Sequence, residues 1–313
     1  MFQDSIDLQF SNLTSLRSLD LSCANLVPDF SSVFVSLKLQ PKLDVGSFLS
    51  IISYGYLSSP NLRWLEGLRN LRYLVMTGVD LSKASESFQW AEPVSSLSNL
   101  IVLRLSNCNI SGRILIGQLL NLTSLSVLDM RSYIHPRYLI FMWSKLKFLD
   151  ISFTHVGGTL PSLTNSTSLT LFKADGCSIQ GSIPSSVTKL KKLRTLTLND
   201  NNITGQLPLP KLSYLSANKN NLKGNVLLSL LQKSRLDLIS FGTNGLSVEI
   251  DDQYQPVVQT FQPTVLEFTS CNMRGEIPEL FSNLTSLVIL LLANNSLSGA
   301  IPTGCSIYHP YLH

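Results

Sequence analysis

The chain has 313 residues, of which 44% are apolar and 14% are charged, so it can bury a large core and intrinsic disorder is excluded. Its 24 basic and 20 acidic residues give a net charge of +4. This small, scattered excess argues against binding to nucleic acid or to an anionic membrane surface. Leucine occupies 59 positions, and such a bias toward one aliphatic residue suggests a repeated structural unit.

A pattern of about two dozen residues recurs along the chain. Its form is Leu-x-x-Leu-x-Leu-x-x-Asn-x-Leu-x-Gly-x-Ile-Pro, and the cleanest copy begins at Leu287. In chain order, the copies begin at Leu16, Leu71, Leu100, Leu125, Leu146, Leu169, Leu193, Leu212, Leu236, Pro263 and Leu287. From Leu146 onward the starts lie 19–27 residues apart, which is the spacing of leucine-rich repeats.

The Leu-x-Leu part of each copy predicts a short strand whose leucines point inward and whose other side chains point outward. One coil cannot bury its own leucines, so we expect successive coils to stack into a continuous core. The predicted fold is an α/β-type solenoid, a right-handed leucine-rich-repeat superhelix. Short parallel strands would line its concave face, and irregular or 3-10 segments would form its convex face.

The turn after each strand has a recurring position, here called the ladder position, where an Asn can donate to and accept from neighbouring backbone groups. The residues expected to form this structural ladder are Cys108, Cys177, Asn201, Asn220, Asn244, Cys271 and Asn295. A cysteine there is small, buried and weakly hydrogen-bonding, so we interpret these three as free structural thiols. The odd total of five cysteines does not indicate a disulfide framework.

We interpret residues 1–313 as a single solenoid of about 10–12 repeats. The register is interrupted at residues 31–60, 131–145 and 247–262, and residues 303–313 form a tail outside the repeat. Repeat decay or outer loops are the favoured interpretation of the interruptions, and binding insertions are the alternative. The first seven residues do not resemble a secretory signal, and no apolar run approaches the ~20 residues that span a bilayer.

The sequence predicts neither an enzyme nor a cofactor. The four histidines lack metal-site spacing, and no phosphate-binding loop, nucleophile elbow or kinase catalytic loop is present. The informative residues are therefore the outward-facing ones on and beside the predicted strands, which would suit an extended peptide or a protein surface. The expected ligand contacts are Tyr73, Arg104, Phe148, Asp150, Phe153, Lys173, Asp175, Asn199, Asp200, Tyr214, Asn218 and Lys219.

Asparagine also occurs in seven glycosylation sequons, three of which share the phrase Asn-Leu-Thr-Ser-Leu. The candidate glycosylation sites are Asn12, Asn109, Asn121, Asn165, Asn202, Asn283 and Asn294. Recurrence of one sequon phrase in phase with the repeat makes chance a weaker explanation for those three.

The Gly-x-Ile-Pro half of the repeat, at residues 181–184, 275–278 and 299–302, resembles the extracellular repeats of plant leucine-rich-repeat receptor-like proteins and receptor kinases. Residues 64–71 and 81–84 look like early repeats of the elicitor-binding members. The resemblance implies secretion, glycosylation and a place on the extracellular side of the plasma membrane. It also implies recognition of a peptide or microbial elicitor on the concave face, with a co-receptor kinase, in defence or developmental signalling.

Two other interpretations stay open. One is a soluble protein resembling the polygalacturonase inhibitors, which have a similar size and repeat type. The other is a truncated, non-functional remnant, because the family's signal peptide, paired-cysteine cap, membrane helix and kinase domain are not found in the sequence.

Overall fold

The computed structural model describes residues 12–22, 57–86, 90–111, 119, 121–132, 143–160, 162–206, 212–232, 234–249 and 261–303. The chain divides into two compact units, Met1–Pro136 and Arg137–His313. The boundary falls inside residues 131–145, where the repeat register is interrupted. The interruption at 31–60, the one at 247–262 and the tail at 303–313 lie largely outside the described residues. The single solenoid over the whole chain stays a prediction.

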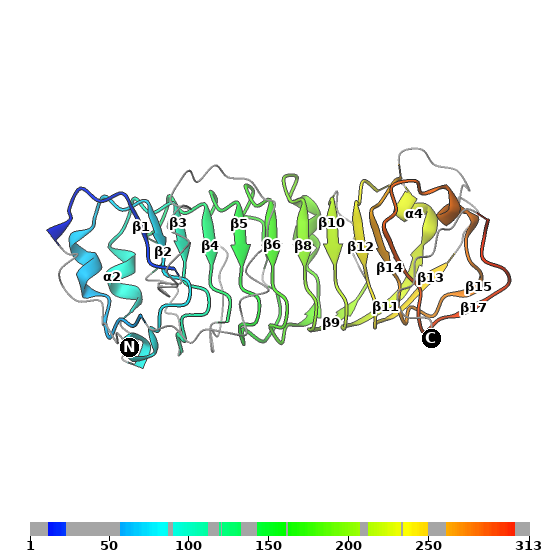
Figure 1. Ribbon diagram of the computed structural model, residues 1–313, viewed down its shortest axis with the longest axis horizontal. Coiled ribbons are helices and arrows are strands. Elements are labelled where there is room, and N and C mark those ends of the chain that lie inside the picture. Colours follow the sequence, from blue (N-terminus) through cyan, green and yellow to red (C-terminus); the bar gives the residue numbers. More distant parts are fainter. Residues whose placement is uncertain are drawn as a thin grey trace, which may run out of the picture. The chain divides into compact units, whose positions relative to one another are not determined.

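Short parallel strands form the sheet of the first unit, one strand per registered copy (Figure 1). In order of pairing these strands are β1 (Ser18–Asp20), β2 (Tyr73–Val75), β3 (Val102–Arg104) and β4 (Val127–Asp129). The helical segments of this unit are η2 (Arg63–Gly67), α1 (Ser82–Glu86) and α2 (Ala91–Ser95). Trp64 and Trp90 are buried beside them and enlarge the core beyond the leucines.

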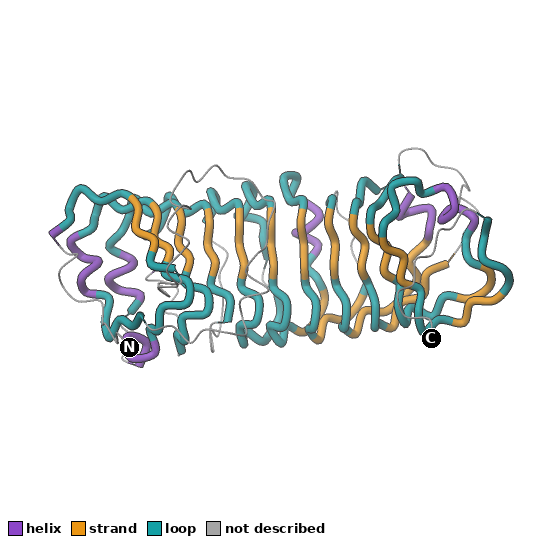
Figure 2. Tube along the Cα trace, viewed as in Figure 1, coloured by secondary structure: helices purple, strands orange, loops and turns teal. Residues whose placement is uncertain are grey.

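Parallel three-residue strands also form the main sheet of the second unit (Figure 2). They are β5 (Phe148–Asp150), β6 (Leu171–Lys173), β8 (Thr195–Thr197), β10 (Tyr214–Ser216), β12 (Leu238–Ser240), β14 (Val265–Glu267) and β16 (Ile289–Leu291). The strands outside the main sheet are β7 (Gln180–Ser182), β9 (Asn202–Gly205), β11 (Asn221–Leu227), β13 (Gly245–Glu249), β15 (Arg274–Glu276) and β17 (Ser296–Ser298). The short helices are η3 (Ser185–Lys189), α4 (Leu228–Gln232) and η4 (Glu279–Asn283).

The burial pattern confirms the predicted parallel-strand solenoid with few helices. In the coil that carries β8, the inward side chains of Leu196 and Leu198 are at most 1% exposed, whereas the outward side chain of Thr195 is half-buried. Side chains along a strand point alternately to opposite faces, but burial does not alternate throughout. The outward residues that end β5, β8, β10 and β12 are at most 5% exposed, and they are Asp150, Thr197, Ser216 and Ser240. The last described coil differs, since Leu290 and Leu292 are only half-buried.

Asn201 shows how neighbouring coils are joined. Its Oδ1 accepts the backbone amides of Cys177 at 3.0 Å and Ile179 at 2.9 Å, both in the preceding coil. Its Nδ2 donates to the carbonyls of Ala174, Leu198 and Asn199 at 2.7–3.0 Å. One side chain therefore satisfies five backbone groups across two coils, which buried polar groups require.

The other asparagines at the ladder position make the same type of contact. Oδ1 of Asn220 accepts the amide of Ile203 at 2.9 Å, and Oδ1 of Asn244 accepts the amide of Leu222 at 3.1 Å. Asn295 accepts two amides from the preceding coil, at 3.0 Å each. In each of these coils the residue just before the ladder position has a positive φ, which turns the chain sharply after the strand.

Candidate ligand-binding surface

The outward side chains of the main sheet in the second unit, together with the three residues after each strand, form what we call the strand surface. Ten of the twelve expected ligand contacts lie there, and Tyr73 and Arg104 lie in the first unit. Five of the ten are half-buried, Asp150 is buried, and Phe153, Asp200, Tyr214 and Lys219 are exposed.

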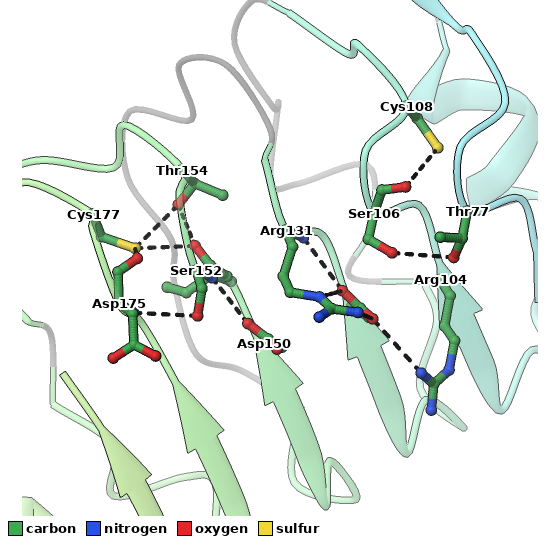
Figure 3. Close-up of polar contacts among 12 residues, drawn as sticks. Thr77, Arg104, Ser106, Cys108, Arg131, Asp150, Ser152, Thr154, Asp175 and Cys177 are labelled. Carbon is green, nitrogen blue, oxygen red and sulfur yellow. Dashed lines mark hydrogen bonds and ion pairs between the residues drawn. The ribbon is translucent and has the colours of Figure 1, made fainter. Parts of the chain in front are cut away.

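Arg104 belongs to a charged group in the first unit that is centred on Asp129 (Figure 3). The Asp129 side chain is 1% exposed and lies 3.6 Å from Nη1 of Arg104 and 3.2 Å from Nε of Arg131. Asp129 and Arg131 were not expected to be site residues, although both occupy outward positions of the repeat register. The two guanidinium groups compensate the charge of a buried carboxylate. The Arg104 guanidinium is therefore already paired with Asp129 and offers fewer donors to a ligand.

Asp150 was expected to face a ligand, but the residue is 2% exposed. Its Oδ1 accepts the backbone amide of Ser152 at 3.0 Å, so the carboxylate closes the turn that follows β5. The prediction that Asp150 lies on the strand was right, but the prediction that its side chain is accessible was wrong. Side chains from neighbouring coils cover a short aspartate more easily than a long residue. Phe153 is 60% exposed, and its ring lies against the backbone of Gly176 in the next coil.

A row of hydrogen bonds links successive coils on the strand surface, and in one link the backbone amide of Asp175 donates to the hydroxyl of Ser152 at 3.2 Å (Figure 3). Asp175 receives the hydroxyl of Thr197 at 2.9 Å and the backbone amide of Asn199 at 2.7 Å. Oδ1 of Asn199 in turn accepts the hydroxyl of Ser216 at 2.7 Å and the amide of Asn218 at 2.8 Å. Each coil therefore positions the polar side chain of its neighbour.

The row ends at Glu267, a residue that the prediction did not include among the ligand contacts. Nδ2 of Asn218 donates to Oε2 of Glu267 at 3.0 Å, and the hydroxyl of Ser240 donates to the same oxygen. Oδ1 of Asn218 is buried and has no hydrogen-bond partner among the residues that the structure describes. Glu267 occupies the same outward position of the repeat as Lys173. The repeat register was therefore sufficient to identify Glu267 as a candidate ligand contact.

Two ionisable side chains on the strand surface have displaced pKa values. The pKa of Asp175 is raised, chiefly because burial penalises the charged carboxylate, although the amide of Asn199 and the hydroxyl of Thr197 oppose this effect. The pKa of Tyr214 is also raised, first by burial and then by the negative charges of Asp175 and Glu267. Both carboxylates therefore act on the same tyrosine hydroxyl.

Asp200 and Lys219 form an exposed ion pair, with 3.2 Å between Oδ1 and Nζ. The side chains are 50% and 66% exposed, so solvent screens the attraction and the pair adds little stability. Both residues precede the ladder position of their coils and have a positive φ. They are accessible to a ligand at the edge of the strand surface.

The three described cysteines at the ladder position are buried free thiols. Burial raises the pKa of Cys108 and of Cys271 to about 12, and it also raises the pKa of Cys177. Such thiols are poor nucleophiles and poor metal ligands because the reactive form is the thiolate. Within the described residues, no group of three or more His, Cys, Asp or Glu side chains could hold a metal ion.

The seven sequon asparagines are all exposed. Asn202 begins strand β9 and Asn283 ends helix η4, so both lie away from the main sheet. Exposure makes each of the seven available to a glycan, and their occupancy stays a prediction. In the described part of the chain, no helix has the length and apolarity needed to cross a bilayer.

The repeat pattern and the fold are shared with known proteins. The Leucine Rich Repeat family matches residues 99–122 and 192–210. No curated protein matches the chain in sequence.

Several solved structures resemble the fold. One is the ectodomain of the plant membrane receptor kinase GASSHO1/SCHENGEN3 from Arabidopsis thaliana, solved in complex with CASPARIAN STRIP INTEGRITY FACTOR 2. The match has 23% sequence identity and a TM-score of 0.69, and it covers 96% of this chain and 35% of the receptor chain. The Arabidopsis receptor kinase HAESA, solved with the peptide hormone IDA and the co-receptor SERK1, shows 22% identity, a TM-score of 0.58 and coverage of 79% and 50%. A plant ice-binding protein shows 26% identity, a TM-score of 0.54 and coverage of 68% and 70%.

The repeat, the parallel sheet and the ladder define a leucine-rich-repeat protein. Over most of its length and at low sequence identity, the chain is structurally similar to the ectodomains of plant leucine-rich-repeat receptor kinases. It spans about a third to a half of the receptor chains that it matches. A fold of this kind is typically non-catalytic.

Proposed function

We propose that this chain is the ligand-recognition part of a plant cell-surface leucine-rich-repeat receptor-like protein, and that its strand surface binds a peptide or protein ligand. The observation that carries the proposal is the strand surface itself. A row of polar side chains is held in place from Asp175 to Glu267, and exposed aromatic and apolar side chains such as Tyr214 lie beside it. Positioned polar groups next to apolar anchors are typical of protein-recognition surfaces.

The comparisons support this proposal through proteins of the same fold. The receptor HAESA was solved with a peptide hormone and a co-receptor, and the GASSHO1/SCHENGEN3 ectodomain was solved with CASPARIAN STRIP INTEGRITY FACTOR 2. For the present chain, the proposal includes a peptide or elicitor ligand and a co-receptor kinase. It also includes an extracellular location at the plasma membrane and a role in defence or developmental signalling. The seven exposed sequons are compatible with passage through the secretory pathway.

A glycan placed on the strand surface tests the proposal. Thr195→Asn creates the sequon Asn-Leu-Thr at residues 195–197, in the row that contains Tyr214. The full chain, secreted from plant cells behind an added signal sequence, would be used to select binders from a display library of random 12-residue peptides. We expect selected peptides to lose at least tenfold in affinity for the glycosylated variant, because the sugar occupies their binding surface.

The matched control is Gln180→Asn, which creates Asn-Gly-Ser at residues 180–182 on strand β7, outside the main sheet. A glycan there should leave peptide affinity unchanged. The proposal fails if repeated selection yields no binders, or if the binders are insensitive to the glycan at residue 195.

A further inference from the structure

Four apolar or aromatic side chains form a continuous strip on the strand surface. Residues Tyr214, Leu238, Val265 and Ile289 are register partners on the adjacent strands β10, β12, β14 and β16. Adjacent parallel strands are about 4.8 Å apart, so these side chains stand next to one another. Tyr214 is 38% exposed and Ile289 is 43% exposed, and the two between them are half-buried. We call these four residues the apolar strip.

The apolar strip is bordered by a negative charge. Glu267 lies two residues beyond Val265 on the same face of β14, about 7 Å further along the strand. Its register partner on β16 is Leu291, which is 44% exposed. A ligand that covers Val265 and Ile289 therefore reaches Glu267 and Leu291 with its next outward side chain.

Gly242 allows Glu267 to adopt its position. A Cβ atom on residue 242 would lie 2.9 Å from Oε1 of Glu267, so the missing side chain leaves room for the carboxylate to cross the coil of β12. On the far side, Oε2 reaches Nδ2 of Asn218, 49 residues away in sequence. The backbone φ of Gly242 is not in the left-handed region, so the glycine serves the close approach and not an unusual turn.

The hydrogen bonds around this charge use donors of the neighbouring coils. Ser240 and Asn218 each donate a hydrogen bond to Oε2 of Glu267, and the hydroxyl of Ser216 donates to Asn199. Within the described residues, Oε1 of Glu267 receives no donor. Lys173 offsets part of the negative charge near Asp175, but it lies at the opposite end of the row, on β6. The end of the row beside the apolar strip is therefore acceptor-rich and negative.

We infer that the partner of this surface is an extended peptide segment with apolar side chains along the apolar strip and a lysine or arginine side chain at Glu267. Charge complementarity selects the basic residue, and the continuous apolar strip selects its aliphatic or aromatic neighbours. The guanidinium or ammonium group donates to Oε1 of Glu267, and Tyr214 contributes an aromatic face to the same segment. This inference rests on the proposed function and specifies the class of ligand.

The random 12-residue peptides selected against the full chain provide the test. We expect enrichment of a lysine or arginine flanked by aliphatic or aromatic residues. For a synthesised peptide of this type, Glu267→Gln should reduce affinity about tenfold, as for a partly exposed charged hydrogen bond. Replacing the basic residue of the peptide should cost the same, and the two changes together should cost little more than either alone. Glu276→Gln, in the same coil on strand β15, is the matched control and should have no effect.

Gly242→Ala provides a second variant that keeps the charge and displaces it. The added methyl group would force Oε1 of Glu267 to move, so basic peptides should bind more weakly. It would also lie 3.3 Å from the backbone oxygen of Thr269, so the unfolding midpoint is measured beside that of Glu276→Gln to check that the variant is folded in the binding assay. The inference is wrong if selected peptides lack a basic residue, or if Glu267→Gln leaves their affinity unchanged. In those cases the proposed function survives provided that the glycan at residue 195 still blocks binding. If that glycan has no effect, or if no peptide is selected, both fail.

Discussion

Coils with asparagine at the ladder position and coils with cysteine there satisfy the neighbouring backbone in different ways. Asn201 donates through Nδ2 and accepts the amides of Cys177 and Ile179 through Oδ1. Cys108 donates from Sγ to the carbonyl of Met76 at 3.0 Å. The amide of Leu81, equivalent to that of Ile179, donates at 2.9 Å to the backbone carbonyl of Cys108.

The comparison shows that one position of the repeat has two solutions. Asparagine bridges coils with its own donor and acceptor, whereas cysteine supplies a weak donor and the main chain supplies the acceptor. The cysteine solution also places a thiol where burial strongly disfavours the charged form. Figure 3 shows two of these thiols, those of Cys108 and Cys177. The two kinds of coil should therefore respond differently to mutation and to chemical modification.

The largest expected effect is on thiol reactivity. Because the pKa of Cys108 and Cys271 is about 12, against 9.0 for an ordinary thiol, the thiolate fraction at pH 8 should be about a thousandfold lower than in the unfolded chain. Alkylation by iodoacetamide, followed by peptide mapping in the native state and in urea, measures this ratio. Equal labelling in the two states would show that these ladder positions open readily.

The second effect concerns the asparagine bridge. Asn201→Ala should lower the free energy of unfolding by about 3 kcal/mol, because it leaves two amides and a carbonyl of neighbouring coils without their partner. Urea denaturation followed by circular dichroism measures the loss. An unshifted midpoint would contradict the bridging role.

A smaller loss is expected in a cysteine coil. Cys177→Ala removes a weak donor that contacts the carbonyls of Ile151 at 3.0 Å and Asp175 at 3.3 Å, and it removes the 3.5 Å contact between Sγ and the hydroxyl of Thr154. We expect a loss of about 1 kcal/mol in the same denaturation assay, since the thiol makes only weak hydrogen bonds. A loss as large as that of Asn201→Ala would mean that the two solutions are energetically equivalent.

The smallest effect is a pH dependence carried by Asp175, two residues before Cys177. Because its pKa is raised in the folded state, the folded chain holds this proton more tightly than the unfolded chain. The contribution of Asp175 to stability is therefore greatest below its ordinary pKa and declines as the pH rises through the raised value. Asp175→Asn removes the decline, so the stability difference between wild type and variant should shift in favour of the variant between pH 3 and pH 7. A difference independent of pH would contradict the raised pKa.

Much of the fold could be predicted because each repeat is read from local sequence. The spacing of Leu193, Leu196 and Leu198 predicts a strand with a buried inner face, and Asn201 three residues later predicts the turn that bridges two coils. The site was less predictable. The outward rows could be identified, but Asp150 is buried and Glu267 reaches two coils back to Asn218. Neither fact follows from the register of a single repeat.

The amino-acid sequence by itself determined which side chains face the core and where each coil begins, because strand alternation and repeat spacing depend on residues close in the chain. The tertiary structure alone decided which outward side chains remain accessible and how they are linked. Those properties depend on the size and hydrogen bonding of side chains about 20–50 residues away, as for Gly242, which leaves space for Glu267 of the next coil. The chemistry of the strand surface is therefore a property of stacked coils and not of any one of them.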